Sequence, residues 1–302
     1  MHFAAILNRD GGTLRTTDLD AFSERMRNTL EAGGHKVDIE IVSGSDIEAA
    51  LEKAAARRGV DVVLACGGDG TVSVAASKLM GKKKALAILP AGTMNLFARG
   101  LGIPLGLDAA IVAFASGKIK AVDIASANGR PFVHQFSIGM HAKMVHLRDK
   151  MKFGSKFGKI RASARAAYTT FMNPPSMRVS LTIGDVEVLT RTRGIGITNN
   201  LLKEGTPLPY AERVDKGVLG VYVTVAEERP ELVKFFFNFA RGRWKQNPQV
   251  EIHEGEKVVL KIISGGGRRR CVIDGELTKL ETATTVEIHP GALNVLVPAD
   301  MA

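Results

Sequence analysis

The fold of the first third of the chain is indicated by one stretch, Val62-Val63-Leu64-Ala65-Cys66-Gly67-Gly68-Asp69-Gly70-Thr71. Its apolar half has the composition of a buried strand, and a helix is predicted to begin at about Thr71. Glycines between a strand and a helix let the backbone approach a ligand closely, and a helix N-terminus attracts anions. The stretch therefore predicts either a phosphate-binding loop or, more simply, a tight strand-to-helix turn.

This loop departs from two common nucleotide-binding patterns. No Gly-Lys-Ser/Thr follows it, so it is not a Walker A motif. Ser73 stands where the third glycine of a Rossmann fingerprint would be. Neither route to nucleotide binding is favoured.

A second turn of the same kind follows the next predicted strand, Leu86–Leu89. It reads Pro90-Ala91-Gly92-Thr93-Met94-Asn95, in which Gly92 permits an unusual backbone and Thr93 and Asn95 supply short polar groups. In an open parallel sheet, ligands bind outside the carboxyl ends of the strands. Because the two loops end consecutive strands, we expect them to face one ligand.

Strand and helix patterns alternate on the N-terminal side of these loops. A strand is predicted at Phe3–Asn8, a helix at 18–32 with Asp18 as its N-cap, and a strand at Lys36–Val42. Ser45–Glu48 has the pattern of a capping box for a helix that ends near Gly59. Repeated strand–helix units predict a parallel sheet with helices on both faces.

The pattern changes close to residues 121–126, where short β-rich runs separated by turn residues begin. Such runs predict an antiparallel sandwich, here interrupted by helices near His141–Phe171 and Pro230–Arg241. We therefore predict an α/β domain at residues 1–124 and a β-sandwich at 125–302, and leave open a return of the C-terminal tail to the first domain. The predicted strands are Phe132–Ile138, Met177–Ile183, Gly194–Thr198, Val218–Ala226, Lys257–Ile263, Thr284–His289 and Leu293–Val297.

The composition of the chain excludes several classes of protein. The 302 residues include 45% hydrophobic and 24% charged residues, an ordinary globular mixture. Two cysteines, Cys66 and Cys271, are too few for a disulfide framework or a four-cysteine zinc site. The sequence contains neither His-Glu-x-x-His nor Gly-x-Ser-x-Gly, so a metalloprotease and an esterase of those types are not expected. No apolar run approaches the ~20 residues that span a bilayer.

The charge is strongly positive and uneven. Lys and Arg number 41 against 31 Asp and Glu, a net charge of +10. Nucleic acid, an anionic membrane and phosphorylated ligands are the partners that such a charge attracts. Between His141 and Arg165, eight basic residues face one acid, Asp149; the eight are Lys143, Arg148, Lys150, Lys152, Lys156, Lys159, Arg161 and Arg165.

Longer stretches resemble a known family. Gly67–Thr71, followed by Ile88–Pro104, looks like the diacylglycerol kinase catalytic-domain family, to which bacterial soluble lipid kinases and the sphingosine and ceramide kinases belong. Asn8 matches the asparagine of that family's N-terminal loop, although Arg9 replaces the proline that follows, and Ile273–Glu276 matches its Asp-Gly-Glu. Gly-Gly-Asp-Gly-Thr alone is shared with NAD kinases and 6-phosphofructokinases, so the paired motifs carry the resemblance.

The resemblance implies a nucleotide-binding α/β domain and a C-terminal β-sandwich, with ATP in the cleft between them. Asp274 would be the general base toward a lipid hydroxyl, with Glu276 in support, which suits phosphoryl transfer. The alternative for Asp274-Gly275 is a plain hairpin turn. The residues implied to hold the nucleotide are Asn8, Ser43, Gly67, Gly68, Asp69, Gly70, Thr71, Thr93 and Asn95.

The resemblance also implies Mg²⁺, with Asp69, Asp123 and Asp215 as its ligands. Two positions depart from the family here. In the family, a network of carboxylates surrounds the magnesium ion of the nucleotide, and Leu96 stands where this network often has an aspartate. Some bacterial members have a second, structural metal site with an Asp-Asp-Gly sequence, and here Lys216 replaces its second aspartate. Because an ammonium is unfavourable beside Mg²⁺, we do not expect this second site to be intact.

Three segments bear on a lipid partner. The basic run at 143–165 suits an anionic bilayer. Phe235–Phe239 with Arg241, Arg243, Trp244 and Lys245 suits a membrane interface, or else an amphipathic helix that buries its aromatic side chains. Arg268–Arg270 precedes Asp274 and suits phosphates or a solvated loop. We expect a cytoplasmic protein in peripheral contact with an anionic membrane; a homodimer stays open.

The leading hypothesis is an ATP-dependent lipid kinase acting on diacylglycerol or a similar lipid. A kinase of a soluble acceptor, such as NAD, shares Gly67–Thr71 but not the block Pro90–Pro104. A non-catalytic nucleotide or lipid sensor is favoured by Leu96 and Lys216. Nucleic acid is not expected as a partner, because aromatic residues are only 6% and no recognised binding motif is present.

Overall fold

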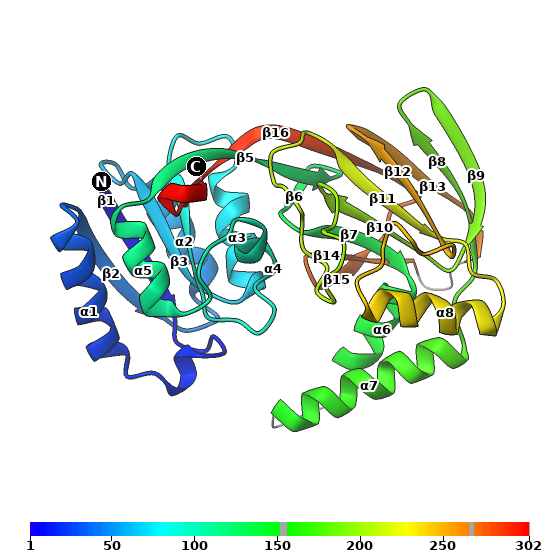
Figure 1. Cartoon of the computed structure of the whole chain (residues 1–302), viewed down its shortest axis with the longest axis horizontal. Coiled ribbons are helices and arrows are strands. Elements are labelled where there is room, and N and C mark those ends of the chain that lie inside the picture. The colour runs from blue at the N-terminus through cyan, green and yellow to red at the C-terminus, as the bar shows by residue number, and fades with distance from the viewer. Residues whose placement is uncertain (152–155, 266–268, 302) are drawn as a thin grey trace. The chain divides into compact units, whose positions relative to one another are not determined.

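The computed structural model describes residues 1–151, 156–265 and 269–301, with no side chains described at 156, 157, 159 and 160. The chain divides into two compact units (Figure 1). Unit 1 comprises Met1–Ile124, Tyr210–Gly217 and His289–Ala302. Unit 2 comprises Ala125–Pro209 and Val218–Ile288.

Unit 1 contains the predicted parallel sheet. Its strands are β1 (His2–Asn8), β2 (Lys36–Val42), β3 (Val62–Gly67) and β4 (Ala85–Pro90), in the order β2-β1-β3-β4. All four are parallel, and the C-terminal part of β16 (Ala283–Val297) extends the sheet beside β4. Every residue of β3 and β4 is buried, which explains their continuous apolar sequence.

Helices join these strands: α1 (Leu19–Ala32), α2 (Ile47–Ala56), α3 (Asp69–Leu79), α4 (Leu96–Gly100) and α5 (Leu107–Ala115), with a 3₁₀ turn at Leu14–Thr16. The α1 helix packs against α5, and α2 packs against α3 (Figure 1). These elements confirm the predicted α/β fold.

The two predicted helix caps have different outcomes. The Asp18 side chain accepts the backbone N–H groups of Asp20 and Ala21, so it caps α1 as expected. The prediction of a capping box at Ser45–Glu48 is wrong. Asp46 is the N-cap residue of α2 and makes no side-chain capping bond, because its carboxylate accepts the hydroxyl of Ser43.

Unit 2 is the predicted β-sandwich. One antiparallel sheet has the order β12-β11-β10-β7-β14-β15. Its strands are β7 (Gln135–Gly139), β10 (Gly194–Asn199), β11 (Leu219–Thr224), β12 (Val250–Gly255), β14 (Arg270–Ile273) and β15 (Glu276–Lys279). The facing strands are β8 (Met177–Ile183), β9 (Val186–Thr192), β13 (Lys257–Gly265) and the N-terminal part of β16. The last residues of β5 (Lys118–Ala127), from Ala125 on, pair with β6 (Arg130–Phe132) at the side.

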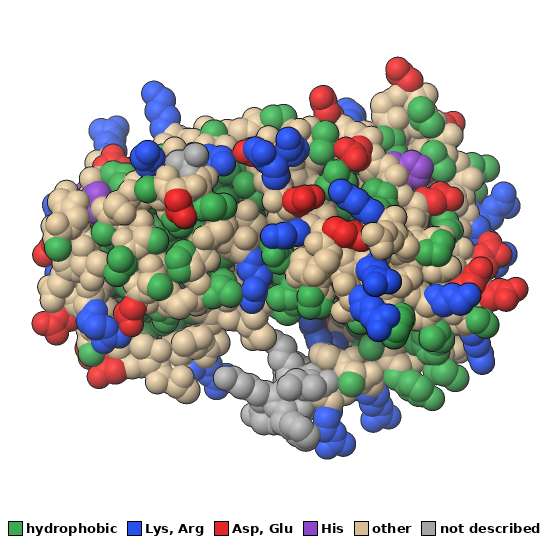
Figure 2. Space-filling view, viewed as in Figure 1, with side chains coloured by type: hydrophobic (Ala, Val, Ile, Leu, Met, Phe, Trp, Pro, Cys, Tyr) green, Lys and Arg blue, Asp and Glu red, His purple; other side chains and the backbone are tan. Residues whose placement is uncertain are grey.

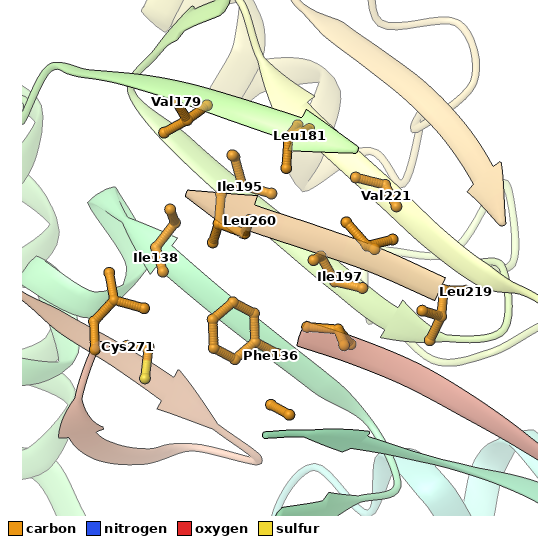
Figure 3. Packing of buried hydrophobic residues seen from close by; sticks show 14 of the residues in the cluster. Phe136, Ile138, Val179, Leu181, Ile195, Ile197, Leu219, Val221, Leu260 and Cys271 are labelled. Atoms are coloured by element: carbon orange, nitrogen blue, oxygen red, sulfur yellow. The ribbon is translucent and has the colours of Figure 1, made fainter. Parts of the chain in front are cut away.

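The core of unit 2 lies between its two sheets. Figure 3 shows Phe136 and Ile138 of β7 beside Leu260 of β13, with Val179 and Leu181 of β8 close by. These side chains are fully or almost fully buried. Alternation along the strands puts one face of each sheet into this core, which is the arrangement of a sandwich.

The described part of unit 2 contains three helices: α6 (Met140–Asp149), α7 (Lys156–Met172) and α8 (Arg229–Ala240). The single helix predicted near His141–Phe171 is wrong, because α6 ends at Asp149 and α7 is a separate helix that packs against it. The helix predicted near Pro230–Arg241 is confirmed as α8. Glu228 and Glu231 form a capping box at its start. A last 3₁₀ turn covers Ala299–Met301.

Candidate functional site

The parallel strands of unit 1 end together, and their last residues carry the predicted loops. In the sheet register Asn8 lies opposite Val42, and Gly67 lies opposite Pro90. The Asn8 amide donates a hydrogen bond to the Thr71 hydroxyl at 3.2 Å. The ends of β1 and β3 are therefore joined through side chains that the sequence predicted for one site.

The glycine loop and the second loop are in backbone contact. A Cβ atom on Gly92 would lie 2.7 Å from the Cα of Gly68, and one on Gly67 would lie 2.5 Å from the Thr71 hydroxyl. Both positions need glycine because neighbouring atoms already fill the space. At Gly70, which is exposed, a Cβ would meet no atom within 4 Å. Gly70 thus faces open space at the start of α3, where the first N–H groups lack helical partners.

Asp69 and Asn95 fasten the two loops together. The Asp69 carboxylate accepts the N–H groups of Asn95 and Leu96 at 3.0 and 2.7 Å, and so caps α4. Asn95 is buried with φ of +50°, and its amide bonds Gly92 through both its oxygen and its nitrogen. Their side chains are thus engaged within the loops. Thr93 is exposed beside them.

Ser43 follows β2 at the same edge of the sheet. Its hydroxyl contacts Asp46 and Ser45. The neighbouring Gly44 N–H donates to the carboxylate of Asp10 at 2.7 Å, which ties the loop after β2 to the loop after β1. The structure therefore places Ser43 with the other residues predicted to hold a nucleotide.

The three predicted metal ligands do not form a metal centre. Among the described residues, no three His, Cys, Asp or Glu side chains are grouped closely enough to hold an ion. Asp123 accepts the N–H groups of Gly217 and Gly291 at 2.6 and 3.0 Å. The carboxylates of Asp123 and Asp69 thus both accept hydrogen bonds from backbone N–H groups and are not grouped around a metal site.

Asp215 is bound to basic side chains of its own unit. Arg213 donates to both of its carboxylate oxygens, at 2.9 and 3.0 Å, and the Lys120 ammonium lies 3.4 Å away. The hydrogen bonds from Arg213 hold the pKa of Asp215 below its ordinary value, and Lys120 adds to the effect. These cations fill the place that a metal ion would need, so a protein-held Mg²⁺ does not fit here.

Asp274 lies in the turn between β14 and β15. Asp274 and Gly275 have φ of +46° and +88°, which is the backbone of a type I′ hairpin turn. The Asp274 carboxylate accepts the N–H groups of Val133, His134 and Gln135 at 2.9 to 3.0 Å. The turn is therefore a hairpin, and its carboxylate also fixes the segment that leads into β7.

Glu276 lies on the exposed side of the same turn, where it is paired with Arg130 of β6. The two side chains are 62% and 47% exposed, so the pair is screened by solvent and contributes less than about 1 kcal/mol to stability. Asp274 and Glu276 thus differ in setting, with one carboxylate held by backbone and the other open to solvent.

Unit 2 also contains an apolar pocket of about 370 Å³ that the sequence did not reveal. Helices α6, α7 and α8 cover it, and the strands β7, β10 and β11 form its floor. Its apolar wall includes Met140, Met144, Phe235, Phe236, Phe239 and Trp244. At Gly196 in the floor a Cβ would meet no atom within 4 Å, so the absence of a side chain leaves that space open.

The pocket has a polar end. His141 Nδ1 lies 2.6 Å from the Ser137 hydroxyl and 3.2 Å from the Gln135 amide. Burial lowers the pKa of His141 to about 4, so its ring is neutral at pH 7. The Thr170 hydroxyl, in a residue 2% exposed, has no hydrogen-bond partner among the described residues. Gln135 connects this end to Asp274, which binds its backbone N–H.

Residues from at least five separate stretches of sequence meet at the pocket, so no single motif could have revealed it. A partial signal was present in Phe235–Phe239. The structure buries part of Phe235 and Phe236 against Leu232 and Met140, as the amphipathic alternative predicted, whereas Phe239, which that alternative also buried, is 38% exposed. Each of these aromatic residues contributes to a wall that only the folded chain assembles.

The outer face of α8 is apolar and basic. Val233 and Phe237 are each 55% exposed, and the Arg241 guanidinium lies 3.9 Å from the centre of the Phe237 ring. Figure 2 shows hydrophobic and basic side chains next to one another over this helix. In the basic run, Lys152 lies outside the described residues, and the side chains of Lys156 and Lys159 are not described. Arg268 of the segment Arg268–Arg270 also lies outside the described residues.

Two family models match the chain. The diacylglycerol kinase catalytic domain matches residues 2–127. The YegS C-terminal NAD kinase beta sandwich-like domain matches residues 135–297, which is more than half of the chain. A Yersinia pestis protein named "Probable lipid kinase YegS-like" is 39% identical over 203 residues, covering 63% of this chain and 66% of the relative.

Solved structures match over the whole chain. A Bacillus anthracis structure named as a diacylglycerol kinase has a TM-score of 0.73 and 18% identity, covering 100% of this chain and 98% of that one. Another structure from the same organism has a TM-score of 0.78 and 20% identity, covering 100% and 96%. At such identities the likeness shows the fold alone.

Proposed function

This chain belongs to the family of the YegS C-terminal NAD kinase beta sandwich-like domain and also matches the diacylglycerol kinase catalytic domain, and we propose that it transfers the γ-phosphate of ATP to a lipid hydroxyl, with diacylglycerol as acceptor and phosphatidic acid as product. In this reaction the hydroxyl oxygen forms a bond to the γ-phosphorus. The bond from that phosphorus to the bridging oxygen breaks, ADP leaves, and the hydroxyl proton passes to a base.

The loops of unit 1 support the nucleotide half of the proposal. The open space at Gly70 and the N-terminus of α3 suit phosphate oxygens, which backbone N–H groups can bind. Asn8, Thr71 and Ser43 lie at the same edge of the sheet and would hold the rest of the nucleotide. Since the carboxylates of Asp69, Asp123 and Asp215 are bound by groups of the protein, we propose that the phosphates of ATP would hold the Mg²⁺ ion.

The apolar pocket of unit 2 is the main observation in support of a lipid as the acceptor, and we call it the acceptor pocket. Its apolar wall suits an acyl chain, and its polar end suits an ester or hydroxyl group. Thr170 supports this view, because a buried hydroxyl without a partner costs about 1–3 kcal/mol, which a polar ligand atom would offset. A soluble acceptor such as NAD would gain little from such a wall.

Asp274 is proposed as the base that receives the hydroxyl proton. Three backbone N–H groups fix its orientation, and an ionised carboxylate only accepts hydrogen bonds, so it suits a hydroxyl that must donate one. In phosphoryl transfer a base acts mainly by orienting the nucleophile. Its carboxylate also positions Gln135, which lines the acceptor pocket.

Peripheral contact with an anionic membrane would bring the lipid to the enzyme. Phe237 and Arg241 on α8 suit an interface in which a ring enters the headgroup layer beside a cation. Among the described residues no helix is both long enough and apolar enough to cross a bilayer. We propose attachment to the cytoplasmic leaflet through α8 and the described basic side chains of α6 and α7, Lys143, Arg148, Arg161 and Arg165.

The test is phosphate transfer from labelled ATP to a panel of lipids in mixed micelles with Mg²⁺, with NAD as a soluble acceptor. Labelled lipid is the expected product, and the panel names the acceptor. If NAD alone yields a labelled product, the proposed activity is wrong and the protein is an NAD kinase. ATP binding with no product from any acceptor would favour a sensor instead.

A further inference from the structure

Unit 2 has a second pocket, of about 590 Å³, on a different face of α6 from the apolar one. Met140, His141 and Met144 of this helix line the apolar pocket. Lys143, His146 and Lys150, spaced by three and four residues and so on one helical face, line the second. Residues 173–177 and the ends of β13 and β14 complete its wall.

All charged side chains among the described lining residues of this second pocket are basic. Besides Lys143 and His146 of α6 and Lys150 directly after it, Arg269 and Arg270 line the pocket, and no Asp or Glu is among the described lining residues. Two of the cations are fixed in place. The Lys143 ammonium donates to the carbonyl of Asn173, and the Arg269 guanidinium donates to the Thr282 hydroxyl at 2.9 Å.

Two further cations are left for a ligand. For Lys150 and Arg270, the described residues provide neither a side-chain hydrogen bond nor an ion pair, although both line the pocket. Like charges gathered in a concave site repel one another and concentrate anions there. An arginine fork matches phosphate oxygens with two parallel hydrogen bonds, and lysine adds a point charge.

We propose that this basic pocket is a binding site for a phosphomonoester, separate from the nucleotide loop and from the acceptor pocket. A phosphomonoester carries close to two negative charges at pH 7, which suits several convergent cations better than a singly charged group does. The source is a lipid headgroup of the phosphatidic acid type or a free phosphate. Because α6 lines both pockets, this helix would separate a phosphomonoester in the basic pocket from a lipid in the apolar pocket.

The test compares wild type with the double variant Lys150→Gln/Arg270→Gln. Binding of inorganic phosphate and of glycerol 3-phosphate is measured by calorimetry, with a non-hydrolysable ATP analogue present to fill the loop of unit 1. The variant should bind at least tenfold more weakly than wild type. The matched control, Lys261→Gln/Arg229→Gln, removes two exposed charges of unit 2 outside the pocket and should bind like wild type.

Vesicles separate the two sources. Wild type and both variants are sedimented with phosphatidylcholine vesicles that contain either phosphatidic acid or, at equal surface charge, phosphatidylglycerol. A preference for phosphatidic acid that only Lys150→Gln/Arg270→Gln abolishes identifies a lipid headgroup, whereas phosphate binding without that preference identifies a free phosphate. Equal phosphate affinity of wild type and Lys150→Gln/Arg270→Gln, or no binding by wild type, overturns the proposal. Since no turnover is measured, this outcome is independent of the proposed kinase activity.

Discussion

The glycine loops of unit 1 and the acceptor pocket of unit 2 are built in opposite ways. The loops come from two short stretches, and their side chains mostly hold backbone, as Asp69 does for α4. What they offer a ligand is backbone and open space at Gly70. The pocket is assembled from side chains of three helices, four strands and the segments that connect them. Backbone geometry leaves a local signature in the sequence, whereas a wall of scattered side chains does not.

The largest effect is expected from Asp274→Asn. Loss of the proposed base should lower kcat by about 10²–10⁴-fold, the range usual for general bases. The amide also presents N–H where a backbone N–H now donates, so the free energy of unfolding should fall by about 1–3 kcal/mol. Lipid phosphorylation and denaturant unfolding measure the two effects. The matched control Glu276→Gln removes an exposed carboxylate and should change kcat far less. A kcat within tenfold of wild type would remove Asp274 from the mechanism.

Substitutions at three glycines sharpen the contrast within unit 1. Gly70→Ala should leave the free energy of unfolding unchanged, because its Cβ meets no protein atom, yet weaken ATP binding about tenfold or more. Gly67→Ala and Gly92→Ala instead force contacts under 3 Å and should destabilise the fold by about 1–3 kcal/mol. Nucleotide titration and chemical unfolding compare them. Unchanged ATP affinity in Gly70→Ala would contradict a phosphate site at this loop.

Filling the acceptor pocket tests unit 2 alone. Gly196→Leu should place a side chain in the open floor, with a retained fold, unchanged ATP affinity and a rise in KM for the lipid of about tenfold. Gly196→Ala adds one methyl group at the same place and serves as the control, with a smaller rise. The measurement is initial rate against lipid mole fraction in micelles. Equal KM values for Gly196→Leu and wild type would place the lipid elsewhere.

The smallest effect is expected from His141, whose protonation makes the free energy of unfolding depend on pH. Its pKa is lowered to about 4 by burial, so between pH 4 and 6.5 the unfolded chain binds more protons than the folded one. The free energy of unfolding should therefore fall as pH drops from 6.5 toward 4, by on the order of 2 kcal/mol from this residue. In His141→Gln that part of the decline should be absent. Urea unfolding at pH 7 and 4.5 measures it, and parallel declines in both proteins would show that His141 is not buried neutral.

Much of the fold could be predicted from the sequence. The alternating patterns predicted the parallel sheet and the sandwich, and Asp18 marked the start of α1. The capping box at Ser45 failed because Asp46 turns its carboxylate toward Ser43, a competition between neighbouring side chains that spacing does not reveal. The long helix near His141–Phe171 failed because similar compositions on both sides of a break give no sign of where α6 ends.

The sequence alone determined the four parallel strands of unit 1, the glycine loops and the Asp274 turn, because each depends on the backbone preferences of consecutive residues. Only the tertiary structure decided what the acidic residues do. Asp123 holds the amides of two segments far apart in the chain, and Asp215 is bound by Arg213 and Lys120. The apolar and basic pockets on two faces of α6 were decided in the same way. A carboxylate or a cavity takes its role from its neighbours in space, and those neighbours are set only when distant segments pack together.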